Sequence, residues 1–282
     1  MRITSKLNFL LAAALVACTA MNLRADENGE KGRAVFDKNQ LCAVTVQLTQ
    51  KISMTMPGRG GQPRENRLEV TGTVVDPSGL TVLALSACDP SEILSRIGSE
   101  VKVDTELSDI KILLDDGGEL PAEIVLRDKD LDLAFIRPKT KVAAPMAAVD
   151  LTKSATAKVL DQVVTLNRLN RASGRAHSAA LERISAVIQK PRTFYIPDSS
   201  MTGTAQGSPV FALDGNFVGV VVMRAVNSVG SSQRENVTSI ILPAEDILKG
   251  AKQAPEAKGD AEKKDAPKEG TEAKEPKAED KK

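Results

Sequence analysis

The stretch Thr202-Gly-Thr-Ala-Gln-Gly-Ser-Pro-Val-Phe-Ala-Leu-Asp-Gly-Asn-Phe-Val-Gly-Val-Val-Val222 decides the fold. Two apolar segments run into and out of an Asp214-Gly215 turn, which is a strong signal for a β-hairpin. The loop Gly203-Thr-Ala-Gln-Gly-Ser-Pro209 precedes the hairpin and consists mostly of small residues. Such a loop can turn sharply and point backbone N–H groups into a cleft. We therefore expect an antiparallel hairpin with a cleft-facing loop in front of it.

The composition limits the kind of protein. The chain has 282 residues, 41% of them hydrophobic, so it can form one large domain or two small ones around a proper core. Aromatic residues make up only 2% and Trp is absent, which argues against stacking platforms for single-stranded nucleic acid. The net charge is +1, so no bulk attraction to DNA or anionic lipid is expected. We expect no nucleic-acid partner.

The first residues have the pattern of a secretory signal, expected over residues 1–25. Basic residues precede the apolar run Phe9-Leu-Leu-Ala-Ala-Ala-Leu-Val-Ala17, which is too short to span a bilayer. Leu15-Val-Ala-Cys18 fits the lipobox of bacterial lipoproteins, with Cys18 as the lipidated N-terminus, whereas ordinary signal peptidase could cut after Ala20 or Ala25. Both alternatives predict an exported bacterial protein, periplasmic or envelope-associated. Membrane contact is limited to the lipid anchor of the first alternative.

The cysteines and the single histidine bear on cross-links and metals. In an exported protein Cys42 and Cys88 can form a lasting disulfide, although two separate buried thiols explain them at least as well. These two residues and His177 lack the short ligand spacings of a zinc site. The sequence also has no Gly-rich phosphate-binding loop. We therefore expect neither a metal nor a cofactor.

Short strands separated by turn signals follow one another along the chain. Leu41-Cys-Ala-Val-Thr-Val-Gln-Leu-Thr49 alternates apolar with smaller or polar residues at period two, as a half-buried strand does. Further strands are expected at 68–75, 80–85, 110–114, 122–126, 131–136, 159–166, 184–189, 194–196 and 238–242, and a short helical turn at 89–97. This succession of short strands and turns predicts an all-β barrel or sandwich.

The strands fall into two halves of similar size. The expected division is an N-terminal linker at 26–40, a first barrel at 41–138, an inter-barrel linker at 139–151 and a second barrel at 152–249. From residue 250 to 282 the chain alternates Lys, Glu, Asp, Ala and Pro, which cannot bury enough apolar surface to become ordered. We expect a disordered tail, whose removal before Ala251 leaves the melting temperature unchanged.

Several stretches resemble trypsin-like serine proteases of the HtrA/DegP type, in the order which that family has them. The loop and hairpin at 202–222 resemble its Gly-Asn-Ser-Gly-Gly-Pro nucleophile loop and the two strands after it. The other matching stretches are Val70-Thr-Gly-Thr-Val-Val-Asp-Pro-Ser-Gly79, Asp128-Lys-Asp-Leu-Asp-Leu-Ala-Phe-Ile136, Leu160-Asp-Gln-Val-Val-Thr-Leu166 and Ser239-Ile-Ile-Leu-Pro243. The resemblance implies two antiparallel six-stranded β-barrels with short helices. It does not extend to the family's PDZ domain, whose place after Leu248 is taken by the charged tail.

The same resemblance implies where a Ser-His-Asp triad would lie. The orienting aspartate falls on Asp132, the histidine on Ser86 or, in a second register, on Ala87, and the nucleophilic serine on Gln206. An amide cannot be an acyl-transfer nucleophile, and neither Ser86 nor Ala87 offers an imidazole. Asp132 has an alternative structural role, as an acceptor of backbone N–H bonds at a turn. Ser86, Asp132 and Gln206 are expected to meet at the seam between the barrels.

Two further parts of the family's site are altered. Its oxyanion hole would use the amides of Gln206 and Thr204. Gly207 keeps the turn, but Thr204 replaces a glycine and is expected to deform the hole. A displaced Ser208/His177 dyad is the alternative catalytic arrangement, although His177 is expected in a surface loop of the second barrel.

The sequence therefore predicts an exported trypsin-like double barrel without an intact triad, a pseudoprotease that binds or scaffolds a protein or peptide partner. One alternative is a serine endopeptidase that uses the displaced dyad. Another is an envelope structural protein in which the fold only positions the tail.

Overall fold

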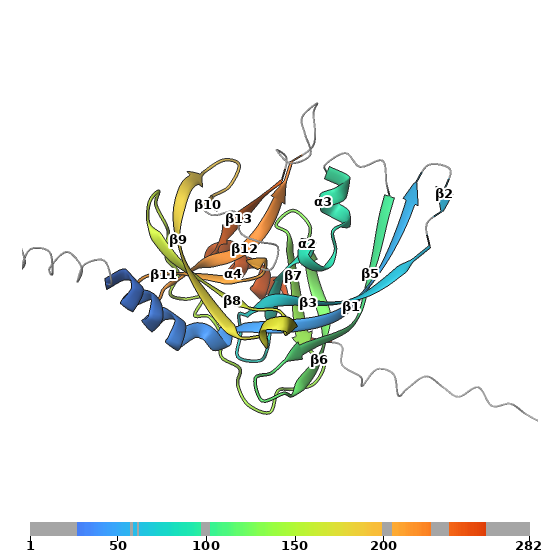
Figure 1. Ribbon diagram of the computed structural model, residues 1–282, viewed down its shortest axis with the longest axis horizontal. Helices are drawn as coiled ribbons and strands as arrows, with labels where there is room; N and C mark the ends of the chain where they lie inside the picture. The colour runs from blue at the N-terminus through green and yellow to red at the C-terminus, as the bar shows by residue number, and fades with distance from the viewer. Residues whose placement is uncertain are drawn as a thin grey trace, which may run out of the picture.

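Two β-barrels stand side by side in the computed structural model (Figure 1), which describes residues 27–56, 59–60, 62–96, 102–198, 205–226 and 237–257. Each barrel contains a closed ring of six antiparallel strands, so the predicted all-β fold with two six-stranded barrels is confirmed. Short helices accompany the barrels, as the sequence also predicts. The expected signal segment with Cys18 and residues 258–282 of the expected tail lie outside the described residues.

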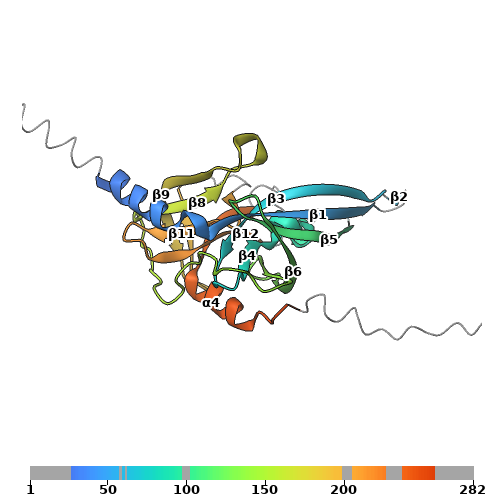
Figure 2. The same cartoon turned by 90° about the horizontal axis from the view of Figure 1, so that it is seen from below.

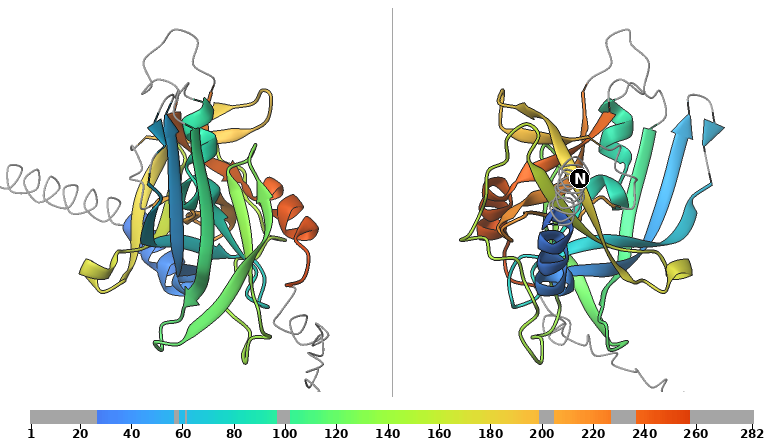
Figure 3. Two further views of the ribbon diagram at one scale, coloured as in Figure 1. Left: turned by 90° about the vertical axis from the view of Figure 1, so that its right-hand side faces the viewer. Right: turned by 60° about the vertical axis from the view of Figure 1, so that its left-hand side comes forward.

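The first barrel closes because β1 is long enough to pair with a strand on each side. Its order is β1-β3-β4-β7-β6-β5, with β5 returning to β1 and the short β2 extending the sheet. β1, β3 and β5 run on past the barrel as a three-stranded arm (Figures 1 and 3). The strands are β1 (Ala43–Met56), β2 (Arg59–Gly60), β3 (Arg64–Val74), β4 (Thr81–Ala84), β5 (Lys102–Leu113), β6 (Glu119–Asp128) and β7 (Leu133–Pro138).

The second barrel contains the hairpin that the Asp214-Gly215 turn predicts. Gly215 has a φ of 82°, and its N–H donates to the carbonyl of Ala212 at 2.9 Å, which closes the turn between β11 and β12. The ring runs β10-β13-β12-β11-β8-β9. Its strands are β8 (Gln162–Arg168), β9 (His177–Ile188), β10 (Phe194–Pro197), β11 (Pro209–Ala212), β12 (Phe217–Ala225) and β13 (Val237–Pro243). The short helices are η1 (Gln40–Cys42), α2 (Leu85–Cys88), α3 (Ser91–Arg96), η2 (Arg171–Ser173) and α4 (Ala244–Gln253).

The N-terminal linker expected at 26–40 is instead helical from residue 27 to residue 39. The helix lies beside the second barrel (Figure 2), and its Val35 is buried in the same apolar cluster as Val164 and Leu166. The helix forms because this apolar face has a barrel surface to cover, and tertiary packing supplies most helical stability. The sequence between residues 26 and 40 carries no strong local signal for that contact.

The seam between the barrels depends on the backbone of Gly207. This residue has a φ of 85°, and a Cβ built there would lie 2.1 Å from the carbonyl oxygen of Thr71 in β3. Its N–H donates to the carbonyl of Val221 at 2.8 Å, and its own carbonyl accepts from Thr73 Oγ1 at 2.7 Å. Only glycine allows this conformation and this approach together. The loop in front of the hairpin is thereby fixed against both barrels.

The ordered region ends later than the sequence predicts. α4 continues to Gln253, Ala254 is buried, and Arg137 Nε donates to the carbonyl of Pro255 at 2.8 Å. Gly250 packs so closely on Phe135 that an added Cβ would lie 2.6 Å from the ring. Ala, Lys and Gln suit both a helix and a solvated tail, so composition could not place the boundary. The packing against the first barrel places it.

Truncation therefore has two different expected outcomes. A chain ending at residue 257 should keep the melting temperature of the full chain. A chain ending at residue 250 should lose about 1–2 kcal/mol of unfolding free energy, because the last helical turn, the burial of Ala254 and the Arg137 hydrogen bond are removed. Thermal unfolding of the two truncated chains measures the difference, at roughly 2–4 °C per kcal/mol for a protein of this size. Identical melting temperatures would show that residues 251–257 contribute nothing.

Candidate functional site

Ser86, Asp132 and Gln206 lie together at the seam although they are far apart in sequence. Ser86 is in α2 directly after β4, Asp132 precedes β7, and Gln206 is in the loop before β11. Ser86 Oγ is 2.8 Å from Asp132 Oδ2 and 3.4 Å from Gln206 Oε1. The side chains at all three positions that the resemblance assigns to a triad are therefore in polar contact at one place.

The carboxylate of Asp132 holds parts of both barrels. It accepts hydrogen bonds from the Ser86 N–H at 2.7 Å, from Ser86 Oγ, and from the Met223 N–H at 2.7 Å in β12. Its backbone has a φ of 58°, and its carbonyl accepts from the Leu85 N–H at 2.9 Å. A buried carboxylate is stable only when hydrogen bonds replace its water, and these contacts do so. Asp132 thus joins α2, β7 and β12.

Gln206 fills the position of the expected nucleophile with a longer side chain. It is only 5% exposed, and its Nε2 lies 3.9 Å from Met223 Sδ. The single hydroxyl proton of Ser86 goes to Asp132 at the shorter distance, so it does not also serve Gln206 Oε1. With its amide turned about the terminal bond, Gln206 would instead donate from Nε2 to Ser86 Oγ. In either orientation the amide meets the hydroxyl directly.

Ser86 and Gln206 invert the side-chain sizes that a triad has at these two positions. A triad has a large ring at the first position and a small hydroxyl at the second. Here the small hydroxyl stands at the first position and the long amide at the second, and the two are in contact. The space that an imidazole would bridge is occupied by the Gln206 side chain.

The oxyanion positions are described only in part. Thr204 lies outside the described residues, so the geometry of its amide is not part of the structure. Gly207 keeps the turn, as expected, and Ser208 N–H donates to the carbonyl of Ala205 at 3.1 Å within the same loop. Because the Gly207 N–H is bonded to Val221, it is not available to an incoming oxyanion.

The structure gives Ser208 and His177 different partners. Ser208 is fully buried, and its Oγ donates to Asn167 Oδ1 at 3.2 Å. His177 opens strand β9, so its expected place in a surface loop is wrong; the pairing of β8 with β9 extends further than the turn signals indicate. Its Nε2 lies 3.2 Å from Asp115 Oδ2 and also contacts Arg168 Nη1. Each half of the displaced dyad is thus held by other residues.

Asp115 links this group to the first barrel. It forms an ion pair with Arg168, with 2.8 Å between Nη1 and Oδ1. Burial alone would raise the pKa of Asp115, but the hydrogen bond with His177 and the charge of Arg168 outweigh burial and lower the pKa below its ordinary value. The carboxylate therefore stays ionised beside Arg168 and His177.

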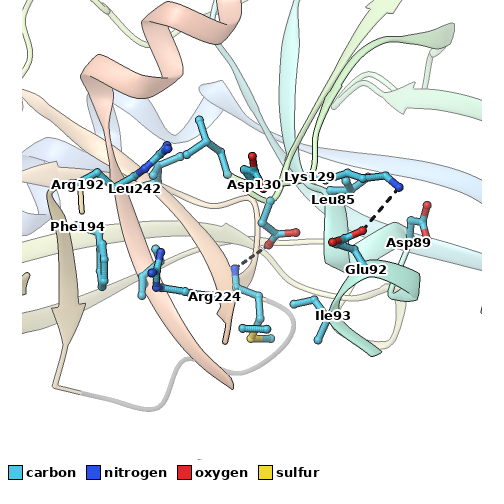
Figure 4. A pocket seen from close by; sticks show the side chains of 15 residues that line it. Leu85, Asp89, Glu92, Ile93, Lys129, Asp130, Arg192, Phe194, Arg224 and Leu242 are labelled. Carbon is cyan, nitrogen blue, oxygen red and sulfur yellow. Dashed lines mark hydrogen bonds and ion pairs between the residues drawn. The ribbon is translucent and has the colours of Figure 1, made fainter. Parts of the chain in front are cut away.

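Asp132 also lines a small hollow, which Figure 4 shows from close by. It has a volume of about 40 Å³, and the residues that surround it include Leu85, Met223 and Leu242. Arg224 stacks on Phe194, with its guanidinium carbon 4.8 Å from the ring centroid. The close-up also shows an ion pair between Lys129 and Glu92 on the opposite wall. Side chains leave room here for little more than a water molecule or two.

Cys42 and Cys88 are separate buried thiols, so the disulfide alternative is wrong. They belong to different apolar clusters, because Cys42 ends η1 and Cys88 ends α2. Burial raises the pKa of Cys42 to about 12. Burial, with the negative charge of Asp89, raises the pKa of Cys88 to about 12 as well. Both thiols are therefore protonated and unreactive in the folded protein.

The family follows from a sequence comparison. The model of the trypsin-like peptidase domain matches residues 70–220, which is more than half of the chain and includes Ser86, Asp132 and Gln206. The chain belongs to this family. A search of the curated proteins finds no match. The part of the family fold that the match contains is the part that brings the three seam residues together.

Two solved structures are similar to this chain. The HtrA-type protease AlgW, solved with a tripeptide, is 16% identical with a TM-score of 0.50, over 79% of this chain and 62% of that one. This chain thus spans less than two thirds of that protein's length. The MamO protease domain from Magnetospirillum magneticum, in its apo form, is 16% identical with a TM-score of 0.48, over 76% of this chain and 97% of that one.

Sequence reasoning missed three features of the site of this trypsin-like domain. The Met223 amide contributes a backbone group, which no residue type could signal. The stacking of Arg224 on Phe194 joins β12 to β10 and depends on the barrel order. The role of Arg168 was indicated in the sequence only by the three arginines between residues 168 and 175.

Within the described ranges, no group of three or more His, Cys, Asp or Glu could hold a metal, and no helix is long and apolar enough to cross a membrane.

The size inversion predicts coupling between two substitutions. Ser86→His alone should destabilise the fold by about 1–3 kcal/mol, because the ring would overlap the Gln206 side chain. Gln206→Ser alone should also destabilise it, because the vacated space is not refilled. The double variant should lose less unfolding free energy than the two single variants added together, by about 0.5–3 kcal/mol, because the two side chains share one space. Denaturant unfolding of the four proteins measures this cycle, and additive losses would contradict the inversion.

The thiols give a second test. In a chain without residues 1–25, Cys42 and Cys88 should not react with a colorimetric thiol reagent at pH 8, where a pKa of about 12 leaves on the order of one thiolate in 10⁴. Both should react after unfolding in guanidinium chloride. If no thiol reacts after unfolding unless a reductant is added, the two cysteines form a disulfide in the isolated protein.

Proposed function

We propose that this protein is a non-catalytic member of the trypsin-like peptidase family which acts by binding or scaffolding a protein or peptide partner. The observation that carries the proposal is the direct contact of Ser86 with Gln206 beside Asp132. Serine cannot act as the general base that an imidazole provides, and an amide cannot be the attacking group. The hydroxyl of Ser86 donates to Asp132, and the Gln206 side chain lies against that hydroxyl.

The proposal includes export to the bacterial periplasm or envelope. It rests on the N-terminal signal pattern, with either lipidation at Cys18 or cleavage by ordinary signal peptidase. Mass spectrometry of the mature N-terminus separates the two: a diacylglyceryl Cys18 supports the lipoprotein, and an unmodified N-terminus at Met21 or Asp26 supports ordinary cleavage.

An endopeptidase that uses Ser208 and His177 is the rival function. Ser208 would have to leave Asn167, and His177 would have to leave Asp115 and Arg168, before either could meet the other. The contacts of both residues therefore argue against this rival. It remains a defined outcome of the experiment below.

The purified protein should neither hydrolyse an unfolded substrate such as casein nor react with a fluorophosphonate probe. Loss of the nucleophile or of the base costs on the order of 10⁶ in turnover in a serine protease, and loss of both costs little more. Gel fluorescence measures labelling, and release of acid-soluble peptides measures hydrolysis. An active serine protease labelled in parallel is the positive control.

The matched variants separate the possible sources of any activity. Labelling of the unmodified protein that Ser208→Ala abolishes would overturn the proposal in favour of the displaced dyad. The double variant Ser86→His with Gln206→Ser restores the family's side chains around Asp132. We expect it to stay nearly inactive until Thr204→Gly is added, because threonine is expected to misdirect the oxyanion amide.

A further inference from the structure

A second cavity lies between β3 and the hairpin that joins β8 to β9. Its volume is about 160 Å³, and Gln206 forms part of its wall. A cavity of about 150 Å³ holds a group the size of benzene, so this one can hold a single amino-acid side chain or a chain end. The apolar part of its lining comes from Leu68, Val70 and Leu169, and the polar part includes Arg168 and Thr45.

Arg168 uses only one side of its guanidinium within the protein. Nη1 contacts Asp115 and His177, whereas no described residue accepts a hydrogen bond from Nε or Nη2. The side chain is only 9% exposed, and its Nε is fully buried. The Nε–Nη2 edge is one of the two edges with which arginine binds a carboxylate in a bidentate manner. A buried donor without a partner is costly, and a ligand that accepts from it removes that cost.

Thr45 adds a second unpartnered group to the same cavity. Its side chain belongs to β1 and is 3% exposed, and its Oγ1 is buried without a hydrogen-bond partner among the described residues. Two lining residues with unsatisfied polar atoms are unusual, because most buried polar side-chain atoms are hydrogen-bonded. Both atoms can donate to an acceptor.

The charges around the cavity leave an excess of one cation. Glu69 also lines it, but Arg175 binds both of its carboxylate oxygens, at 2.6 and 3.0 Å. The hydrogen bond from Arg175 lowers the pKa of Glu69, so this pair is a neutral unit. Arg168 is balanced by Asp115. Arg171, on the same hairpin and near Glu69, has no such partner in the described part of the chain.

We propose that this cavity binds a carboxylate of a peptide partner, received by the free edge of Arg168 and by Thr45 Oγ1, with Arg171 supplying the balancing charge. The aliphatic part of the bound residue would pack on Leu68 and Val70. The carboxylate belongs either to a glutamate side chain or to a free chain end. This inference rests on the proposed function, because it names the chemistry of the partner.

Three peptides test the inference by nuclear magnetic resonance of the ¹⁵N-labelled protein. They are acetyl-Ala-Val-Glu-Val-Ala-amide, the same peptide with Gln in place of Glu, and acetyl-Ala-Val-Ala with a free carboxylate. We expect saturable shifts of the Arg168 Nε–H signal with at least one carboxylate peptide, at no more than a tenth of the concentration that the Gln peptide needs. The peptide that succeeds identifies the source as a side chain or a chain end.

Equal titrations by all three peptides, or no change at the Arg168 signal, would overturn the inference. Mass spectrometry of the peptides after the titration tests the proposed function independently of the carboxylate inference. Cleaved peptides would overturn the non-catalytic proposal and leave carboxylate binding in place. Intact peptides that bind without a preference for the carboxylate would overturn carboxylate binding and leave the non-catalytic proposal in place.

Variants locate the contact. Arg168→Lys keeps a charge beside Asp115 but removes the Nε–H, and should weaken the carboxylate peptide about tenfold. Thr45→Val should weaken it several-fold while leaving the melting temperature unchanged or higher, because the hydroxyl has no partner in the free protein. Arg183→Gln is the matched control: it removes an exposed charge of β9 outside the cavity lining and should leave binding unchanged. Weakening of equal size in the control would refute the assignment.

Discussion

The approach of Gly207 to β3 is the constraint on which the site depends. The loop before β11 belongs to the second barrel, yet its backbone touches the carbonyl of Thr71 and receives a hydrogen bond from Thr73 in the first. Any side chain at this position would separate the barrels, because its Cβ would overlap β3 backbone. Gln206 is next in the chain, so its position against Ser86 follows from the same contact.

Asp132 makes the complementary connection from the first barrel to the second. In a serine protease the corresponding aspartate orients an imidazole. Here the carboxylate is satisfied by two backbone N–H groups and a hydroxyl, one of the N–H groups belonging to β12. Such a group stabilises the seam without any catalytic partner, since breaking it would leave a buried charge unpaired. The arrangement at the seam therefore has a structural role that does not depend on catalysis.

The hairpin between β8 and β9 is the third connection, and it is ionic. Arg175 with Glu69, and Arg168 with Asp115, both cross from the second barrel to the first. These partly buried pairs hold the hairpin over β3, and one member of each pair, Glu69 and Arg168, lines the 160 Å³ cavity. Three kinds of contact thus hold the seam: the Gly207 backbone contact, the Asp132 carboxylate and the two ion pairs.

The sequence by itself determined the two antiparallel barrels, the Asp214-Gly215 hairpin and the residues at the triad positions, because period-two alternation, turn residues and motif order are local properties of the chain. Tertiary structure decided what those properties cannot express. The helix at residues 27–39 and the end of α4 form because a barrel surface is present for Val35 and Ala254 to cover. The two cysteines stay apart, the Met223 amide reaches Asp132, and one edge of Arg168 remains unpaired because of how the strands are ordered in space. Contacts between segments distant in the chain depend on that order, and sequence spacing carries no measure of it.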